Sequence, residues 1–427
     1  MTSPGERLEA LRKHQRANWF SRSPSEVASA NARLLFGTAG EWDLPEGVEP
    51  KRDLLYLAVG IPDVDALPRE ALAEAAVATL SRSGDLALRY GFGKGPSGLR
   101  EWLAARRSQE EGVGVDAEWF QLTNGSSGAI DLVVRSMIDP GDVIIAENPT
   151  YMGTLHNFRG VGADIRYVPM DEEGLDTQAL ERLLVELRDE GKVVKLIYTI
   201  SAYHNPTGAT LSIERRLRVL ELAARHEVMV LDDEAYRDLW FNTPPPPSLS
   251  TLSGGCGVIA TGTFSKTVAT GLRVGWIHAP PELLALFGRM RFAMGQNQFG
   301  LRTFGEFLDR GQFEPHLARV RELYRDKRDR LHAALTREVG AYMRWRLPEG
   351  GFYLWARLGE GIALEPLWRS AVQEGIAVNP GSGFAAGGNL DMDCIRIAFA
   401  WTPMDQFDEA ARRLRLACER VLRGDAA

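Results

Sequence analysis

Short apolar runs alternate with segments of helical periodicity over residues 54–276. Four runs have the length and the Val, Ile and Leu content of buried strands, namely 120–122, 142–146, 195–199 and 228–231. Helices are predicted over 127–137 and, from the spacing of Ile213, Leu217, Leu220 and Ala224, between the last two strands. This alternation predicts βαβ units, and therefore a largely parallel sheet with helices on both faces. Such sheets bind ligands at the carboxyl ends of their strands.

A second, smaller domain is predicted towards the C-terminus. A long helix over 313–338 leads to apolar runs at 351–355 and 395–399, and a final helix carries Phe407, Ala410, Leu414, Ala417 and Val421 on one face. Before the alternating region, a short amphipathic helix is expected over 6–20, followed by a turn-rich stretch with Gly37 and Gly40. The expected organisation is an N-terminal arm (1–53), a large domain (54–310) and a small domain (311–427) that includes part of the arm.

Composition narrows the class of protein. The 427 residues are enough for two domains, and the 44% apolar and 25% charged content is ordinary for a soluble protein. The net charge of −7 argues against a nucleic-acid partner, and no apolar window is long enough for a membrane span. The three cysteines are widely spaced and form no CxxC pair, so we expect no disulfide framework, no metal site and a reducing, cytoplasmic setting.

One hydroxyl-rich turn is the first candidate for chemistry. Lys266 follows the apolar run 258–260, Arg273 lies seven residues further on, and Thr263 and Ser265 precede the lysine. A lysine amine can form a Schiff base with a carbonyl cofactor, and an arginine together with hydroxyls can bind a phosphate. Taken alone, the turn is just as typical of two solvated surface cations.

Two further turns come just after predicted strands. Gly125, Ser126 and Ser127 lie between a strand and a helix, where backbone N–H groups and the helix dipole favour an anion, although the same residues would also serve as a plain helix cap. Asn205 offers an amide to a phenolic oxygen or a carboxylate, although Asn-Pro-Thr-Gly is a good turn in any protein. The neighbouring His204 is expected to be a turn residue, because no metal-spaced partner accompanies it.

Acidic and aromatic residues follow two other strands. Asp232, Asp233 and Glu234 come at the end of an apolar strand, where burial of a carboxylate is costly unless a cation such as a protonated pyridine nitrogen requires it. A solvated acidic loop explains them equally well. Tyr151 follows the strand at 142–146 and could stack on a ring, although a lone aromatic is more often a packing residue. Each signal is weak alone, but their joint occurrence after successive strands is hard to attribute to coincidence.

In their order and spacing, these motifs resemble those of the class I and II aminotransferases, fold-type I enzymes that depend on pyridoxal phosphate (PLP). The similarity is greatest to the branch of aminoadipate, kynurenine and aromatic aminotransferases, and it extends over residues 57–422. The resemblance implies an α/β fold with a mostly parallel central sheet in the large domain and a smaller α+β domain. The motifs that carry it are Tyr90-Gly91, Gly125-Ser126-Ser127, Asn205-Pro206-Thr207-Gly208, Asp233-x-x-Tyr236, Ser265-Lys266 with Gly271-Leu272-Arg273-x-Gly275, Pro348-x-Gly350-Gly351-x-Tyr353, in which the last position is Phe or Tyr in the family, and Arg396 in an Ile-Arg-Ile strand.

The resemblance also implies a role for each matching residue. Lys266 would hold PLP as a Schiff base and then move a proton as base and acid. Asp233 would pair with the pyridinium nitrogen, and Tyr236 and Asn205 would hydrogen-bond the phenolic oxygen. The other implied cofactor contacts are Tyr151 as the stacking ring, the phosphate ligands Gly125, Ser126, Ser127, Thr263, Ser265 and Arg273, and Tyr90, which would reach the phosphate of a neighbouring subunit and so implies a homodimer with shared sites.

The implied reaction moves the amino group of an L-amino acid to a 2-oxo acid by a ping-pong mechanism. Arg396 would bind the substrate α-carboxylate, with help from Asn205 and from a backbone donor at Gly60. A β-lyase, decarboxylase, cyclase or oxidase would use the same motifs, so these reactions stay open. An aminotransferase-like transcription regulator is disfavoured, because the segment before the similar region is short and not strongly basic. That segment matches no specificity signature, so the substrate is not predicted.

Two departures from the family pattern concern the lysine turn. Thr263 stands where many relatives have Ser or Gly, but it keeps a hydroxyl for the phosphate. The spacing from Lys266 to Arg273 is one residue shorter than in the aspartate aminotransferase type. This shorter spacing matches the aminoadipate-like branch.

Overall fold

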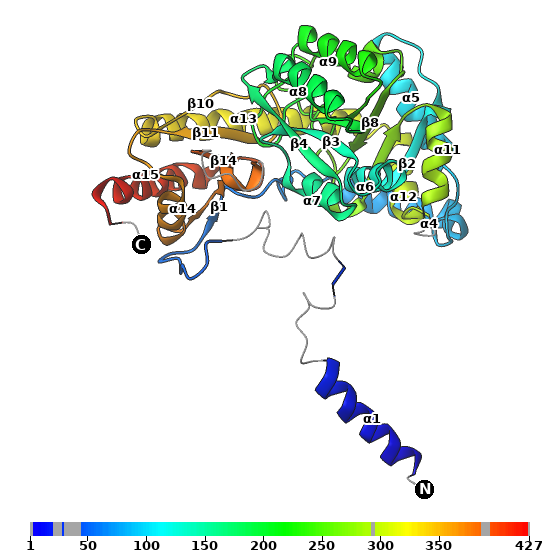
Figure 1. Ribbon diagram of the computed structural model, residues 1–427, viewed down its shortest axis with the longest axis horizontal. Coiled ribbons are helices and arrows are strands. Elements are labelled where there is room, and N and C mark those ends of the chain that lie inside the picture. Colours follow the sequence, from blue (N-terminus) through cyan, green and yellow to red (C-terminus); the bar gives the residue numbers. More distant parts are fainter. Residues whose placement is uncertain (1–2, 20–27, 30–43, 292–294, 386–392, 426–427) are drawn as a thin grey trace.

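The structure is a computed structural model of the full chain, and it describes residues 3–19, 28–29, 44–291, 295–385 and 393–425 (Figure 1). Helix α1 (Pro4–Trp19) confirms the helix predicted over 6–20 and lies apart from the other elements. It begins at a reciprocal pair of bonds, in which the Glu6 N–H donates to the Ser3 hydroxyl at 3.2 Å and the Ser3 N–H donates to the Glu6 carboxylate at 2.7 Å. The predicted turn residues Gly37 and Gly40 lie outside the described residues.

An eight-stranded mixed sheet forms the larger part of the molecule, with the strand order β2-β9-β8-β7-β6-β3-β4-β5 (Figure 1). Strands β8, β7, β6, β3 and β4 are parallel neighbours, whereas β9 is antiparallel to both β2 and β8, and β5 is antiparallel to β4. The mostly parallel sheet is thereby confirmed. The strands are β2 (Phe120–Asn124), β3 (Val143–Asn148), β4 (Asp164–Asp171), β5 (Gly174–Leu175), β6 (Val194–Thr199), β7 (Met229–Asp233), β8 (Val258–Thr263) and β9 (Val274–His278).

Helices cover both faces of this sheet, because side chains along each strand alternate between the faces. In β3, Ile144 and Ala146 pack against α6, α7 and α11, whereas Val143 and Ile145 pack against α8, α9 and α10. The helices on the first face are α6 (Gly125–Met137), α7 (Met152–Gly160) and α11 (Pro281–Met290). Those on the second face are α8 (Thr177–Asp189), α9 (Ile213–Arg225) and α10 (Leu249–Leu252).

The C-terminal part contains a four-stranded antiparallel sheet with the order β10-β11-β14-β13. Strand β1 (Leu55–Tyr56) pairs in parallel with β12 (Ile376–Ala377), so the chain that precedes the large sheet first joins this part. The elements here are β10 (Met343–Trp345), β11 (Tyr353–Leu358), α14 (Leu364–Gln373), β13 (Asn379–Pro380), β14 (Cys394–Ala398) and α15 (Phe407–Arg423).

Long helix α13 (Phe313–Val339) runs along both parts and confirms the helix predicted over 313–338 (Figure 1). The remaining helices are α4 (Arg69–Ala87), α5 (Ser97–Glu111) and α12 (Gln298–Asp309), of which α4 and α12 pack together. None of the helices in the described ranges combines the length and apolar content needed to cross a membrane. The domain limits at residues 53/54 and 310/311 stay a prediction.

Candidate active site

Five strand ends meet at one edge of the large sheet. Strands β8, β7, β6 and β3 are parallel, and β2 runs in the same direction because β2 and β8 are both antiparallel to β9. The residues at or just after these ends therefore share this edge. They are Gly125 after β2, Lys266 after β8, Asp233 at the end of β7, Asn205 after β6 and Tyr151 after β3. The structure thus brings together the motifs that the sequence places after separate strands.

The Lys266 amine is held by the segment that runs from β1 to α4. Its Nζ donates to the Gly60 carbonyl at 2.7 Å and lies 5.7 Å from the centre of the Tyr236 ring. Gly60 was predicted to offer a backbone N–H, and in the structure its carbonyl is the group that is engaged. The Thr263 hydroxyl fixes the turn, because it accepts the Ser265 N–H at 3.1 Å and lies 2.9 Å from the Ser265 hydroxyl.

Arg273 lies against the cup formed by Gly125, Ser126 and Ser127. Its backbone is left-handed, with a φ of 53°, and its Nη2 donates to the Asn124 carbonyl at 3.0 Å. Gly125 has a φ of 77°, a left-handed conformation that favours glycine, and a Cβ there would lie 2.8 Å from that guanidinium. The cup is the N-terminus of α6, and it combines free helix N–H groups, two hydroxyls and a guanidinium. This is a donor set that suits a phosphate.

The three acids of β7 and its end have separate partners. The Asp232 carboxylate accepts the Ser201 hydroxyl at 3.1 Å, and Glu234 is paired with Arg107. Asp233 accepts the Tyr198 hydroxyl at 3.2 Å and the Ala235 N–H at 3.3 Å, and it forms no ion pair within the part of the chain that the structure describes. Burial raises the pKa of Asp233 to about 6, against the weaker lowering effects of the Tyr198 hydrogen bond and of the Lys266 charge. A cation at this carboxylate would relieve that cost.

Tyr236 and Asn205 converge on Tyr353, the last residue of the Pro348-x-Gly350-Gly351-x-Tyr353 motif, for which the sequence predicts no role at the site. The Tyr236 and Tyr353 hydroxyl oxygens are 2.8 Å apart, and the Asn205 amide nitrogen lies 3.5 Å from the Tyr353 hydroxyl. All three side chains are buried. The motif marks the family but predicts no contact for Tyr353, and the pairing of β11 with β14 brings its side chain to the site.

Arg396 on β14 is fully buried. Three of its hydrogen bonds go to neutral oxygens: Nη1 donates to Asn205 Oδ1 at 2.9 Å, and Nη2 donates to Asn379 Oδ1 and to the Ala58 carbonyl, both at 2.8 Å. A buried guanidinium whose N–H groups are already oriented by hydrogen bonds is suited to a carboxylate. Asn379 was not predicted, since a single Asn before Pro380 gives no signal of its own in the sequence.

Tyr90, Tyr151 and His204 lie outside the group of buried contacts described above. The Tyr90 side chain is largely exposed, with 72% of the residue's surface accessible, so no ligand contact within this chain follows from its position. Tyr151 is half-buried at the start of α7 and its ring lies against Gly153, where a Cβ would come within 2.6 Å of the ring. His204, expected to be a turn residue, is buried with its Nε2 3.0 Å from the Glu147 carboxylate.

The family model for aminotransferase class I and II matches residues 52–414. The chain belongs to this family. It is 33% identical over 364 residues to aromatic-amino-acid aminotransferase 1 of Thermococcus litoralis. This alignment covers 85% of this chain and 87% of that relative. It is also 29% identical over 378 residues to an uncharacterized HTH-type transcriptional regulator, YisV, of Bacillus subtilis. This alignment covers 86% of this chain and 76% of that protein.

A solved structure of LysN, the α-aminoadipate aminotransferase of Thermus thermophilus, superposes with a TM-score of 0.83 at 32% identity. The match covers 94% of this chain and 100% of LysN, which was solved as a complex with N-(5'-phosphopyridoxyl)-L-leucine. The predicted fold-type I architecture and the aminoadipate, kynurenine and aromatic branch are thereby confirmed.

This aminotransferase uses PLP, and its residues fit the cofactor. The cup places the Arg273 guanidinium directly against Gly125, which carries no Cβ, and its donors suit the phosphate. The buried Asp233 carboxylate suits a cationic ring nitrogen, and the Tyr198 hydroxyl orients this carboxylate by a hydrogen bond. Tyr198 was not predicted, because it is one of several apolar residues in a strand.

Proposed function

We propose that this aminotransferase moves the amino group of an L-amino acid to a 2-oxo acid in two half-reactions at one site, with Lys266 as the working amine. PLP, when bound, supplies an aldehyde for the amine and a ring that accepts electrons. The observation that carries the proposal is the position of Lys266 at the sheet edge, with Nζ held by the Gly60 carbonyl and facing the Tyr236 ring. From there Nζ would hold the cofactor, then take the proton from the substrate Cα and return it.

The groups around the ring would have distinct tasks. Asp233 would stay ionised against the ring nitrogen and keep it protonated, because the pair avoids the cost of a lone buried carboxylate. Tyr236 and Asn205 would hydrogen-bond the phenolic oxygen. Tyr151 would stack on the ring from α7, and its contact with Gly153 supports a fixed ring orientation.

The phosphate would be held at the N-terminus of α6. Ser126, Ser127 and Ser265 would donate hydroxyls, and Arg273 would add a guanidinium that the Asn124 carbonyl already orients. Thr263 would act through Ser265, because its hydroxyl accepts the Ser265 N–H.

Arg396 would bind the α-carboxylate of the substrate by a bidentate pair, with Asn205 beside it. The three oxygens that accept its N–H groups show that the fork is oriented for hydrogen bonding, which supports this assignment. A donor from the Gly60 backbone stays part of the proposal. The similarity to aromatic and α-aminoadipate aminotransferases supports amino acids with a large side chain as the first substrates to test.

We also propose a homodimer with shared sites. Helix α4 and the loop after it expose a row of apolar side chains, and Tyr90, the residue expected to reach a neighbour's phosphate, lies in that row. Its members are Val77, Leu80, Leu86, Leu88, Tyr90 and Phe92, the last three about equally exposed. An exposed row of this kind marks a protein interface more often than free surface. Sedimentation of the wild type and of Leu88→Glu should give a dimer and a monomer, respectively; a monomeric wild type would contradict the proposal.

The state of the cysteines bears on the cellular location. The three cysteines Cys256, Cys394 and Cys418 are free, and Cys394 and Cys418 are buried as thiols. Free buried thiols suit a reducing compartment, so we propose that the enzyme works in the cytoplasm.

A panel of amino acids tests the reaction. Each is mixed with the PLP-loaded enzyme while the visible cofactor band and the released 2-oxo acid are measured. Loss of the band with one equivalent of oxo acid, reversed by a second oxo acid, is the expected result. Release of ammonia or CO₂ without this half-reaction would instead identify a lyase or a decarboxylase.

Lys266→Ala should abolish the borohydride-reducible cofactor adduct, and an adduct retained on another lysine would contradict the assignment of Lys266.

The similarity to YisV favours one second candidate, a regulatory protein built on this fold. A DNA-binding assay at a stated salt concentration separates the two functions. Sequence-specific binding together with no amino-group transfer across the panel would favour the regulator.

A further inference from the structure

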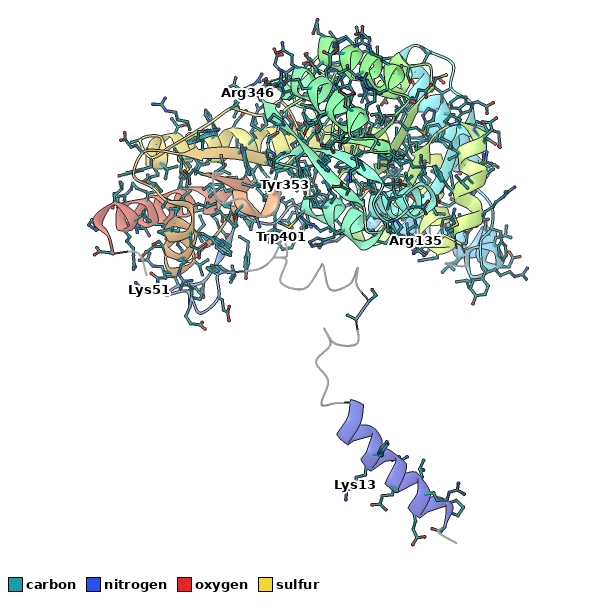
Figure 2. All side chains as sticks on the ribbon, viewed as in Figure 1. Lys13, Lys51, Arg135, Arg346, Tyr353 and Trp401 are labelled. Atoms are coloured by element: carbon teal, nitrogen blue, oxygen red, sulfur yellow. The ribbon has the colours of Figure 1, made fainter. Side chains whose placement is uncertain are left out.

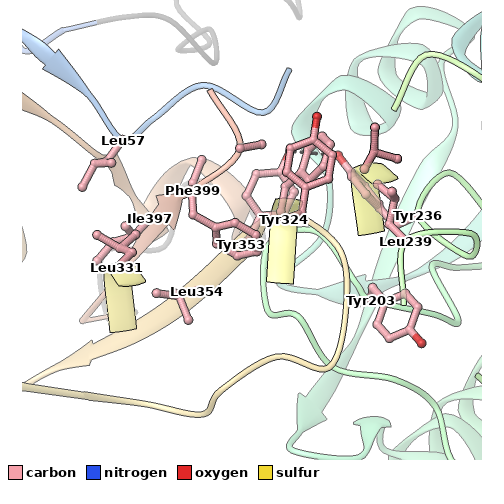
Figure 3. Close-up of a cluster of buried hydrophobic side chains, with 14 of the residues drawn as sticks. Leu57, Tyr203, Tyr236, Leu239, Tyr324, Leu331, Tyr353, Leu354, Ile397 and Phe399 are labelled. Atoms are coloured by element: carbon pink, nitrogen blue, oxygen red, sulfur yellow. Dashed lines mark hydrogen bonds between the residues drawn. The ribbon is translucent and has the colours of Figure 1, made fainter. Parts of the chain in front are cut away.

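Tyr353 is a buried side chain that touches both ends of the proposed site. It lies at the start of β11, where the two sheets approach each other (Figure 2). Figure 3 shows it in one buried cluster with Tyr236 and Tyr324. Its hydroxyl contacts the residues assigned to the cofactor, and its ring contacts the residue assigned to the substrate carboxylate.

The cofactor side of this link is polar. The Tyr353 hydroxyl oxygen is 2.8 Å from the Tyr236 hydroxyl oxygen and 3.5 Å from the Asn205 amide nitrogen. These two groups are the ones proposed to hydrogen-bond the phenolic oxygen. The Tyr236 and Tyr353 rings meet edge to face, with centroids 5.6 Å apart, so the hydroxyl pair is also fixed by packing.

The substrate side is a cation–π contact. The Arg396 guanidinium carbon lies 4.4 Å from the centre of the Tyr353 ring, and the ring is buried. A phenylalanine at position 353 would keep this contact and lose the hydroxyl. The two functions of the side chain can therefore be separated by substitution.

Gly60 shows how tightly the Tyr353 hydroxyl is placed. A Cβ on Gly60 would lie 1.9 Å from that oxygen, and its carbonyl accepts the Lys266 amine. The space at Gly60 is therefore set by Tyr353, and any shift of this segment would move the acceptor of Lys266.

We propose that Tyr353 is a positioning residue of the transamination site: its hydroxyl orients Tyr236 and Asn205 towards the cofactor's phenolic oxygen, and its ring orients Arg396. The proposal rests on the function proposed above. A hydroxyl chain that ends on the phenolic oxygen stabilises negative charge there and weakens the pull of that oxygen on the proton of the lysine–cofactor linkage.

The test is a pH titration of the visible band of the PLP-loaded enzyme, with cofactor affinity measured alongside. Tyr353→Phe should raise the apparent pKa of the band by roughly half to one unit, the effect of one lost hydrogen bond. Its KM for the amino acid should change less than twofold, because the ring over Arg396 remains. Tyr353→Leu should shift the band similarly and also raise KM, by roughly threefold to tenfold. Tyr203→Phe is the matched control, since this buried hydroxyl donates to the Thr243 carbonyl instead.

An unchanged or lowered pKa in Tyr353→Phe would overturn the inference. If Lys266→Ala abolishes the adduct while Tyr353→Phe titrates like the wild type, only this inference fails; if Lys266→Ala keeps the adduct, the proposed function fails. A double-mutant cycle gives a second readout: Gly60→Ala should weaken cofactor binding less in Tyr353→Phe than in the wild type, because the closest clash is removed. Equal losses in both backgrounds would contradict the placement of the hydroxyl.

Discussion

Lys327 of α13 forms a buried ion pair with Asp63, a residue of the segment that supplies Gly60 and Ala58 to the site. Its Nζ also donates to the Ala400 carbonyl just after β14, at 2.6 Å. Burial lowers the pKa of Lys327, and the hydrogen bond and charge of Asp63 oppose that effect. The segment is thus tied to the same helix and strand end that support Arg396, so a remote ion pair fixes the carbonyl groups that hold Lys266 and Arg396.

Lys327→Met should destabilise the fold, because it leaves the Asp63 carboxylate buried without its cation. We expect a loss of roughly 3–5 kcal/mol in the free energy of unfolding, measured by urea denaturation of the apoprotein. The double variant Lys327→Met with Asp63→Asn should recover part of the loss. Lys192→Met serves as the control, since its partly exposed pair with Asp164 is worth roughly 0–1 kcal/mol. Equal losses at Lys327 and Lys192 would contradict this account.

Gly275→Ala should damage the phosphate cup. Its Cβ would lie 2.6 Å from the Gly125 Cα and 2.7 Å from the Gly262 carbonyl oxygen, and neither backbone can move as a flexible side chain would. We expect a cost of roughly 1–3 kcal/mol in stability and a clear loss of PLP affinity, measured by thermal unfolding and by cofactor titration. Gly271→Ala is the matched control, because nothing lies within 4 Å of its Cβ position. Wild-type affinity in Gly275→Ala would show that the cup does not depend on this approach.

The affinity of the apoprotein for PLP should fall as the pH drops below about 6, the value to which burial raises the pKa of Asp233 from 3.8. The folded-state pKa lies above the unfolded one, so ionisation of Asp233 opposes folding as the pH rises from about 3.8 to 6, and a cation against the carboxylate offsets this cost. Below about pH 6 the Asp233 carboxyl of the folded apoprotein is mostly protonated and cannot pair with the ring nitrogen. Affinity should weaken by up to roughly tenfold per pH unit through this group.

Asp233→Asn should bind PLP more weakly and lose that part of the pH dependence. The cofactor phosphate and Lys266 titrate in both proteins, so the difference between the two curves isolates Asp233. Parallel curves for the wild type and Asp233→Asn would contradict the assignment of this carboxylate to the ring nitrogen.

The sequence was sufficient for the parts of the site that lie in local motifs. Strand periodicity predicted the parallel sheet, and this placed Lys266, Asp233 and Asn205 at one edge, because the carboxyl ends of parallel strands must share it. Tyr353 belongs to a family motif and Asn379 to none, but the contacts of neither residue could be predicted in the same way. They reach Arg396 and Asn205 only through the antiparallel pairing of β14 with β11 and β13, a long-range register that no local pattern encodes.

The backbone contact of Gly60 is a second feature that the sequence could not predict. The family resemblance implies a backbone donor from Gly60 to the substrate carboxylate, but it does not predict the contact of the Gly60 carbonyl with Lys266. The carbonyl accepts the Lys266 amine, and the segment that carries it is tied to α13 by the Asp63–Lys327 ion pair, whose residues are 264 positions apart in the chain. Such a pair is visible only after α13 has folded over the segment.

Arg396→Lys should weaken the recognition of the substrate carboxylate, because an ammonium cannot reproduce the fork that now spans Asn205 and Asn379. We expect kcat/KM for the best amino acid to fall by roughly 30-fold to 1,000-fold, carried mostly by KM, while the visible cofactor band is retained. Arg357→Lys is the control, an exposed arginine on the adjacent strand β11. The decisive comparison uses an amine that lacks the carboxylate: the wild type should prefer the amino acid strongly, and Arg396→Lys should lose most of that preference. If the preference survives intact, another residue binds the carboxylate, and the assignment of Arg396 is wrong.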